Sequence, residues 1–273
     1  MSRVFVTGCS SGIGRATAEL LQRRGHAVVA SARALDSIAD LAVEATVALD
    51  VTSAKSVAAA APYLSATEVL VNNAGVTLAA APVESIPEHA LEEILQTNVI
   101  GPLRMAKAVL PGMRARRRGK IINISSVSAH RGNPLLGAYT ASKAALDALS
   151  EALRLEVAHL GITVCCVEPA GVRTRFGSNA FAPDPTDEAY APVQRAMRLV
   201  FEGYNETRIP ASTVAGQVAA LVAQAEPELR NPVGPAAARL LGERRALSDA
   251  EYERTFSKLI GECLFQERAE LAE

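Results

Sequence analysis

A glycine-rich turn near the amino terminus constrains the fold of this chain more than any other feature. Residues Arg3–Val6 form a short strand pattern, and Arg15–Arg24 form a helical pattern that Gly25 stops. The turn between them is Thr-Gly-Cys-Ser-Ser-Gly-Ile-Gly, residues 7–14. This order opens the βαβ unit that binds dinucleotides, because glycines let the backbone approach a pyrophosphate and the helix start offers N–H groups to it. A glycine-rich turn without a ligand is the alternative.

Strand patterns alternate with helix patterns along the remainder of the chain. No internal repeat, low-complexity linker or domain boundary interrupts the alternation. Because such alternation builds a parallel sheet with helices on both faces, we predict one α/β domain over residues 1–273 with a doubly wound parallel sheet. The expected strands are Arg3–Val6, Ala27–Ala32, Ala45–Leu49, Glu68–Val71, Lys120–Ile124 and Ile162–Glu168, with a short last strand or turn at Asn231–Gly234.

One expected helix is long and irregular. It covers Pro87–Met113, and Asn98 lies near its middle, where an Asn side chain disturbs helical backbone bonding. We interpret the basic run over residues 114–120 as a solvated helix end rather than an anion or nucleic-acid patch, because cations complement the helix dipole there. The other expected helices are Ser53–Ala61 with Ser53 as its N-cap, one from Tyr139 to about His159, one between Asp187 and Gly203, Ala211–Ala225, and a charged helical tail from Pro235 to Glu273.

Composition excludes several classes of protein. Hydrophobic residues make up 49% of 273 residues, and the formal net charge is −1, which argues for a sizeable core and against nucleic acid as a main partner. No apolar run reaches membrane-spanning length, and the amino terminus enters a strand pattern at once, so we expect no membrane span, no signal peptide and a cytoplasmic location. The four cysteines show no C-x-x-C spacing and the four histidines no metal-ligand spacing, so we expect reduced thiols and no metal.

Tyr139 and Lys143 form a pair with chemical potential. They lie four residues apart in the helix-favouring stretch Gly137–Leu146, and therefore on one helix face. A neighbouring ammonium stabilises a phenolate and lowers the pKa of Tyr toward neutrality, which would let Tyr139 exchange a proton near pH 7. Two residues that are merely neighbours on a helix surface are the alternative.

Five motifs in order and at matching spacing resemble those of the short-chain dehydrogenases/reductases. The turn T-G-x-x-x-G-x-G resembles the cofactor motif of the compact, single-domain members, whose fold is Rossmann-like. Ser126 precedes Tyr139 by thirteen positions, which is the spacing of the catalytic serine and tyrosine in that family. Ser125 is expected to point the other way. The remaining matches are N-N-A-G at Asn72–Gly75, N-x-x-G beginning at Asn98, and Pro169–Thr174, where Ala170 replaces the first glycine of P-G-x-x-x-T.

The resemblance implies an NAD(P)-dependent oxidoreductase that interconverts a carbonyl and a secondary alcohol. It implies that Ser126 binds the substrate oxygen, Tyr139 transfers the proton, and Lys143 lowers the Tyr pKa and bonds the nicotinamide ribose. Asn98 would hold a water in the proton path, and Asp50 would lie beside the adenine. The implied cofactor-binding residues are Gly8, Ser10, Ser11, Gly12, Ile13, Gly14, Arg33, Asp50, Val51, Asn73, Ala74, Gly75, Tyr139, Lys143, Pro169, Gly171, Val172 and Thr174.

The end of the second expected strand bears on the choice of cofactor. A carboxylate there would bind the ribose 2′-hydroxyl of NAD, but the chain has Ala32 and then Arg33, with no acid before Asp36. A guanidinium suits a 2′-phosphate. The pattern therefore favours NADP(H) over NAD(H), with Arg33 as a solvated loop charge the alternative.

Two segments bear on the substrate. Residues 176–209 mix apolar and polar side chains, and we predict a lid that suits a bulky, nonpolar substrate; packing on the protein's own core is the alternative. The extended ending after Arg230 resembles the family branch that acts on steroids, retinoids and other lipophilic alcohols and ketones. A 3-oxoacyl-thioester reductase and a non-catalytic cofactor-binding scaffold remain alternatives. The tail 235–273 would cover the pocket or contact a partner subunit, and the resemblance implies a homodimer or homotetramer.

Overall fold

The computed structural model describes residues 1–176 and 188–270, with the backbone alone for 201–206 and 263–270. Its centre is a seven-stranded sheet in the order β3-β2-β1-β4-β5-β6-β9, in which every pairing is parallel. A short pair, β7 (Val172–Arg173) and β8 (Ile209–Pro210), stands apart from it. The strands are β1 (Arg3–Val6), β2 (Ala27–Ala32), β3 (Ala45–Ala48), β4 (Val69–Asn72), β5 (Gly119–Ile124), β6 (Ile162–Pro169) and β9 (Arg230–Val233).

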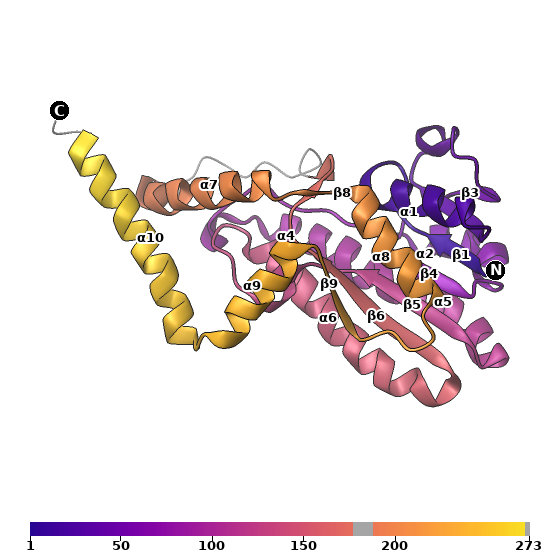
Figure 1. Cartoon of the computed structure of the whole chain (residues 1–273). Coiled ribbons are helices and arrows are strands. Elements are labelled where there is room, and N and C mark those ends of the chain that lie inside the picture. The colour runs from indigo at the N-terminus through magenta and orange to yellow at the C-terminus, as the bar shows by residue number, and fades with distance from the viewer. Residues whose placement is uncertain (177–187, 271–273) are drawn as a thin grey trace.

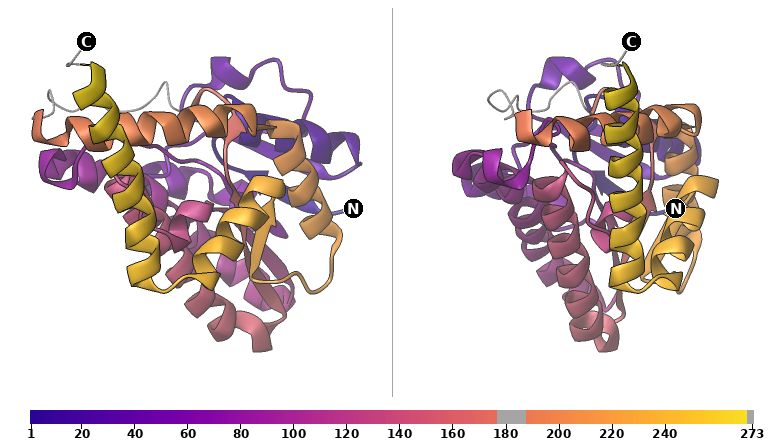
Figure 2. Two further views of the ribbon diagram at one scale, coloured as in Figure 1. Left: turned by 60° about the vertical axis from the view of Figure 1, so that its left-hand side comes forward. Right: turned by 90° about the vertical axis from the view of Figure 1, so that its left-hand side faces the viewer.

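Helices cover both faces of this sheet (Figures 1 and 2). Successive side chains of a strand point to opposite faces, so Val4 and Val6 pack with one set of helices while Phe5 packs with the other. The first face carries α1 (Gly12–Arg23) and α8 (Ala211–Ala223), and the second carries α2 (Ala54–Ala59), α5 (Gly101–Arg116) and α6 (Gly137–Val157). The predicted doubly wound parallel α/β fold is confirmed.

Two expected helices are interrupted. The predicted helix over residues 53–61 is capped by Ser53, whose Oγ accepts from the Ser56 N–H, but it ends at Ala59 and a short α3 (Ala61–Leu64) follows. The predicted long helix begins as α4 (Glu88–Leu95), passes through a π-helical turn η3 (Gln96–Ile100) and continues as α5. Asn98 lies in that π turn, so the disturbance expected of it is confirmed.

The basic run after α5 differs from its expected role at one residue. Arg116 lies in the last turn of α5 and donates to the carbonyl oxygens of Ser65 and Thr67, as a helix-end cation can. Lys120, in contrast, belongs to β5 and is buried, and its Nζ donates to Leu221 O and Gln224 O at the end of α8. The run is therefore not wholly solvated, because Lys120 meets the free carbonyls that end a helix on the neighbouring layer.

The tail forms two helices, α9 (Pro235–Ala246) and α10 (Asp249–Glu270). Leu240 and Leu241 of α9 pack on Val127, in the short 3-10 helix η4 (Val127–His130) that follows β5. Helix α10 lies at the side of the molecule away from the amino terminus and packs against α7 (Ala191–Glu206) (Figure 1). None of the helices in the described part of the chain combines the length and apolar character that crossing a membrane requires.

One tyrosine of α10 ties the tail to the segment that joins β5 to α6. The hydroxyl of Tyr252 donates to the carbonyl oxygen of Gly132 over 2.9 Å. The guanidinium groups of Arg131 and Arg244 lie 5.8 Å and 4.9 Å from the centre of its ring, within the range of cation–π attraction. The tail therefore holds the segment between Ser126 and Tyr139.

Candidate active site

A cavity of about 560 Å³ lies at the carboxyl ends of the central strands. The chain leaves β1 toward β2 on one side and β4 toward β5 on the other, so the loops diverge there and leave a crevice. The cavity brings together eighteen of the twenty site residues expected from the sequence. They are Gly8, Ser10, Ser11, Gly12, Ile13, Arg33, Asp50, Val51, Asn73, Ala74, Gly75, Ser126, Tyr139, Lys143, Pro169, Gly171, Val172 and Thr174. The other two, Gly14 and Asn98, do not line it.

The glycine turn is shaped by close backbone approaches. Gly8 has φ +72°, and a Cβ there would meet Ala74 Cα at 2.8 Å. A Cβ on Gly14 would lie 2.3 Å from Asn73 Nδ2 and 2.4 Å from Gly8 O. Gly14 therefore serves the site through packing, because it lets α1 start close beneath the turn.

Asn73 and Thr7 lock this turn to the loop after β4. The Nδ2 of Asn73 donates to Thr7 O and Gly8 O over 2.9 and 3.0 Å. The Oγ1 of Thr7 accepts in return from the backbone N–H groups of Asn73 and Ala74. The two motifs thus form one rigid floor, which their separation in the sequence does not reveal.

The residues at this end of the cavity suit a pyrophosphate. Helix α1 begins at Gly12, and its N-cap Ser11 makes no side-chain capping bond to the first-turn N–H groups. A Cβ on Gly12, whose φ is +60°, would lie 3.1 Å from Thr174 Cγ2, so the turn and the loop after β7 face each other closely. An open helix start beneath glycines is a favourable setting for an anionic group.

Tyr139 and Ser126 both line the cavity and are joined by a side-chain hydrogen bond. Burial raises the pKa of the Tyr139 phenol to about 12, although a hydrogen bond with Ser126 acts in the opposite direction. The ring is half-buried and stands edge-on to Phe176, with ring centres 6.0 Å apart. The expectation that the phenol titrates near neutrality is wrong for the protein by itself, because burial outweighs the hydrogen bond with Ser126.

Lys143 is buried beneath the phenol. Its Nζ donates to the carbonyl oxygen of Ile124 over 2.8 Å and lies 5.8 Å from the centre of the Tyr139 ring. Burial lowers the pKa of Lys143 to about 8, while the carboxylate of Asp147 opposes that change. The ammonium is held at the end of β5, within reach of the reacting end of the cavity.

Asn98 supports the site from behind. Its Oδ1 accepts from the Val76 N–H, and its Nδ2 donates to Val76 O and to Ser142 Oγ, at 2.9 to 3.0 Å. Ser142 in turn donates to the carbonyl oxygen of Tyr139. Asn98 thus joins the loop after β4 to the first turns of α6, and its expected role toward a water stays a prediction.

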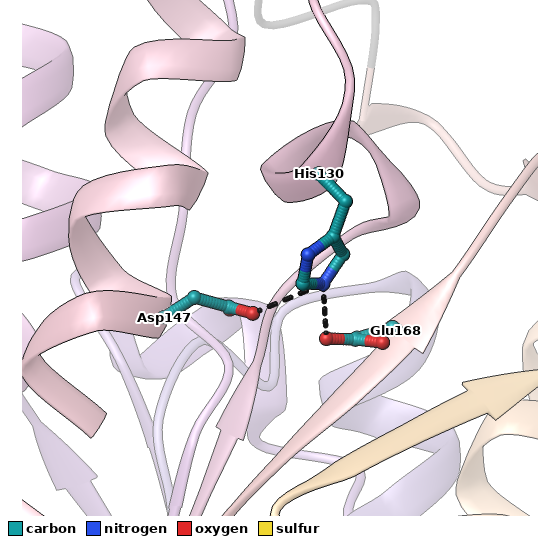
Figure 3. Close-up of side chains that lie close together, drawn as sticks. All are labelled: His130, Asp147 and Glu168. Atoms are coloured by element: carbon teal, nitrogen blue, oxygen red, sulfur yellow. Dashed lines mark hydrogen bonds and ion pairs between the residues drawn. The ribbon is translucent and has the colours of Figure 1, made fainter. Parts of the chain in front are cut away.

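Three titratable side chains meet at Asp147, one helical turn beyond Lys143 on α6, and sequence reasoning missed them (Figure 3). His130 Nε2 lies 2.7 Å from Glu168 Oε1 and 3.3 Å from Asp147 Oδ2. Each offers one potential metal-ligand atom, all within 4.8 Å of one another. Arg230 Nε, however, lies 3.7 Å from Asp147 Oδ2, where its charge would oppose a cation. The one local signal is that Asp147 stands one helical turn beyond Lys143.

The rim of the cavity contains both predicted residues and residues that were not predicted. Arg33 lines it as predicted and is exposed. Phe176 and Arg208, near the two ends of the expected lid segment, also line it, and so does Arg175, which was not predicted. Within that segment Met197 is buried, which fits packing on the protein's own core, whereas Phe181 lies outside the described residues.

Comparisons with known proteins show what this chain resembles. The family model described as short chain dehydrogenase matches residues 2–184. A 3-ketodihydrosphingosine reductase from Bacteroides thetaiotaomicron is 35% identical over 238 residues, covering 85% of this chain and 87% of that protein. Human retinol dehydrogenase 8 is 39% identical over 192 residues, 66% of this chain and 61% of that protein. The crystal structure of a short-chain dehydrogenase from Streptomyces avermitilis superposes with a TM-score of 0.81 at 33% identity, covering 96% of this chain and 97% of that one.

Proposed function

The chain belongs to the short-chain dehydrogenase family, and on that premise we propose that it is an NADP(H)-dependent oxidoreductase that interconverts a carbonyl and a secondary alcohol on a lipophilic substrate. Its family establishes an NAD(P)-dependent enzyme; the preference for NADP(H), the substrate and the roles of the residues are the proposal. The observation that carries it is a single cavity shared by the glycine turn and by Ser126, Tyr139 and Lys143. A cofactor and a proton donor can meet in that space.

The residues present fit a dinucleotide. Gly8 and Gly12, both with positive φ, keep side chains out of the floor, and the open start of α1 offers N–H groups for a pyrophosphate. Arg33 would hold a 2′-phosphate at the end of β2, and no acidic side chain stands in that place to favour a free ribose. When bound, the nicotinamide supplies or accepts the hydride.

The protein's own residues would handle the proton. In the direction of reduction, Ser126 Oγ donates to the substrate carbonyl oxygen and Tyr139 Oη delivers a proton to that oxygen. The high pKa of Tyr139 keeps the phenol neutral, and therefore able to donate, at physiological pH. The Lys143 ammonium then stabilises the phenolate that is left. Such general acid catalysis typically contributes ~10²–10⁴-fold in rate.

A lipophilic substrate is supported by the relatives and by the rim. Both curated relatives are named for lipophilic compounds, a 3-ketodihydrosphingosine and a retinol. The Phe176 ring stands against Tyr139, where an apolar part of a substrate would pack beside the reacting oxygen. The predicted lid over residues 176–209 would extend that apolar contact, and it remains a prediction.

The test is a panel of carbonyl compounds followed by NADPH absorbance. We expect turnover of at least one lipophilic ketone or aldehyde, drawn from steroid, retinoid, long-chain 3-keto base and 3-oxoacyl-thioester substrates. Tyr139→Phe should lose ~10²–10⁴-fold in kcat while NADPH binding persists. Tyr63→Phe, an exposed tyrosine on α3, is the matched control and should behave as wild type.

Two outcomes would contradict the proposal. Near-normal turnover by Tyr139→Phe would remove Tyr139 from the chemistry. Tight NADPH binding by the wild type without turnover of any carbonyl would favour the non-catalytic cofactor-binding scaffold instead.

A further inference from the structure

The His130–Asp147–Glu168 cluster joins the three elements that carry the reacting end of the site (Figure 3). His130 ends η4, which begins directly after Ser126. Asp147 lies on α6, one turn beyond Lys143, and Glu168 lies on β6 next to Pro169 of the cavity wall. We propose that Asp147 is a positioning residue for the reaction, which keeps Lys143 charged and holds the strand end that carries Ser126. This inference rests on the proposed function, in which the Lys143 ammonium stabilises the phenolate of Tyr139.

Asp147 uses its two carboxylate oxygens on different sides. Oδ1 accepts a hydrogen bond from the hydroxyl of Ser125, the residue before Ser126. Oδ2 faces His130 Nε2 at 3.3 Å and Arg230 Nε at 3.7 Å. Asp147 is only 4% exposed to solvent. Its charge is therefore poorly screened by water. The carboxylate of Asp147 thus anchors Ser125, the neighbour of the proposed substrate-binding serine. The same carboxylate supplies a negative charge that favours the Lys143 ammonium.

The charge balance explains why the carboxylate stays ionised. Burial acts to raise the pKa of Asp147, but hydrogen bonds with His130, Ser125 and Glu168 hold it below its ordinary value. The pKa of Glu168 moves in the opposite direction, because burial and the adjacent Asp147 raise it. His130, hydrogen-bonded to Glu168 and in ion-pair range of Asp147, has its pKa raised by both carboxylates to about 9. The charged and titratable groups that face Asp147 are therefore His130 from η4, Cys166 and Glu168 from β6, Arg230 from β9, and Lys143 from α6 itself.

Lys143 depends on this carboxylate. Burial alone disfavours an ammonium, and Asp147 is the first of the influences that act in its favour. The Lys143 Nζ donates to the Ile124 carbonyl, a neutral group that does not neutralise its charge. Without Asp147 the amine would lose its proton at a lower pH, and the phenolate would lose its stabilising partner.

The test removes the negative charge of Asp147 and keeps the shape of its side chain. Asp147→Asn can still accept the Ser125 hydroxyl, but its side chain is neutral. We expect the alkaline decline of kcat for NADPH-dependent carbonyl reduction to move to lower pH by about one unit, a tenfold loss on that limb. In the cofactor-free protein, NMR of lysine labelled at Cε should show Lys143 titrating at a lower pH by a similar amount. Glu151→Gln, a half-exposed carboxylate one turn further along α6 that pairs with Arg230 at 2.7 Å, is the matched control and should shift neither curve.

A second variant gives the opposite sign and guards against misfolding. His130→Gln removes a positive charge next to Asp147 and Glu168 and leaves an amide that can reach Glu168, so the alkaline limb and the Lys143 titration should move to higher pH. Both variants are checked for folding by thermal unfolding; if Asp147→Asn does not fold, His130→Gln decides alone.

The outcomes separate this inference from the function it rests on. An unshifted profile in Asp147→Asn, a downward shift in His130→Gln, or loss of the alkaline limb in His130→Gln would overturn it. Absence of carbonyl turnover by the wild type would overturn the proposed function instead, and the NMR titration would then still decide whether Asp147 sustains the charge of Lys143.

Discussion

Lys143 places its ammonium nitrogen 5.8 Å from the centre of the Tyr139 ring while it donates to the carbonyl oxygen of Ile124. The two side chains share one helix face, as their spacing predicted, yet burial still raises the pKa of the phenol to about 12. The phenol therefore stays protonated in the cofactor-free protein, as its proposed role as proton donor requires.

A titration of the phenol tests this directly. The difference in phenolate absorbance between wild type and Tyr139→Phe, without cofactor, should develop near pH 12 rather than near the ordinary value of about 10. Between these values the unfolded chain has lost the proton and the folded chain keeps it, so the free energy of unfolding should fall as pH rises from 10 to 12. Tyr139→Phe should lack that component. A phenolate that develops between pH 7 and 9 would contradict the prediction.

Two glycine-to-alanine substitutions distinguish the effect of close packing at the floor of the site from the general effect of replacing a glycine in a helix. Gly14→Ala places a methyl group 2.4 Å from the Gly8 carbonyl oxygen, so the turn must move, and we expect destabilisation of about 1–3 kcal/mol and weaker NADPH binding. Gly216→Ala, in α8, meets nothing within 4 Å and should stabilise the fold by up to about 1 kcal/mol. Urea unfolding and NADPH fluorescence measure both. Equal behaviour of the two variants would show that the close approach at Gly14 has no consequence.

The proposed preference for NADP(H) rests on the guanidinium of Arg33. Arg33→Ala should raise the Kd of NADPH by about 10–100-fold and leave the Kd of NADH nearly unchanged, because a charge-assisted bond to the 2′-phosphate is worth about 1.5–3 kcal/mol. Arg23→Ala, an exposed arginine at the end of α1, is the matched control. If Arg33→Ala affects the two cofactors equally, the proposal for the 2′-phosphate fails.

Asn98 should matter to stability as well as to turnover. Asn98→Ala leaves the Val76 N–H and carbonyl without the partner they now share, and we expect a loss of about 2 kcal/mol in the free energy of unfolding together with reduced kcat. Ser142→Ala removes only one of the three bonds to Asn98 and should cost less. Chemical denaturation of both variants measures which of them loses more free energy of unfolding. A smaller effect for Asn98→Ala than for Ser142→Ala would refute this account of the loop.

Features encoded locally were predictable from the sequence. The strand, glycine turn and helix at residues 3–24 follow from residue type and spacing, and so does the parallel sheet. The sequence predicted that Asn98 disturbs its helix, but it did not predict a π-helical turn. The hydrogen bonds that hold Asn98 there involve Val76 and Ser142, which lie on other segments. Most of the expected site residues converged because the carboxyl ends of parallel strands meet at one edge of the sheet.

Long-range features were not predictable. The bracing of Gly8 by Asn73 and the meeting of His130 with Glu168 depend on how separate layers pack, which no local spacing contains. The direction of the Tyr139 pKa failed for the same reason: helical spacing gives the neighbour of a side chain but not its depth beneath the surface. Residue spacing thus predicted which groups meet, whereas burial determined how strongly each holds its proton.

The strand order has a consequence for the stability of the folded protein when a ligand is bound. β1 pairs with β4 over Val4–Val6 and Val69–Val71, where the β3-β2-β1 half of the sheet meets the β4-β5-β6-β9 half. Arg33 and Tyr139 come from opposite halves, and a dinucleotide lying across the cavity would act as a brace between them. Ligand at a hundred times its Kd adds about 2.7 kcal/mol to the stability of a folded state that alone can bind it. The resistance of this protein to unfolding would then rise with the concentration of its cofactor, whether oxidised or reduced.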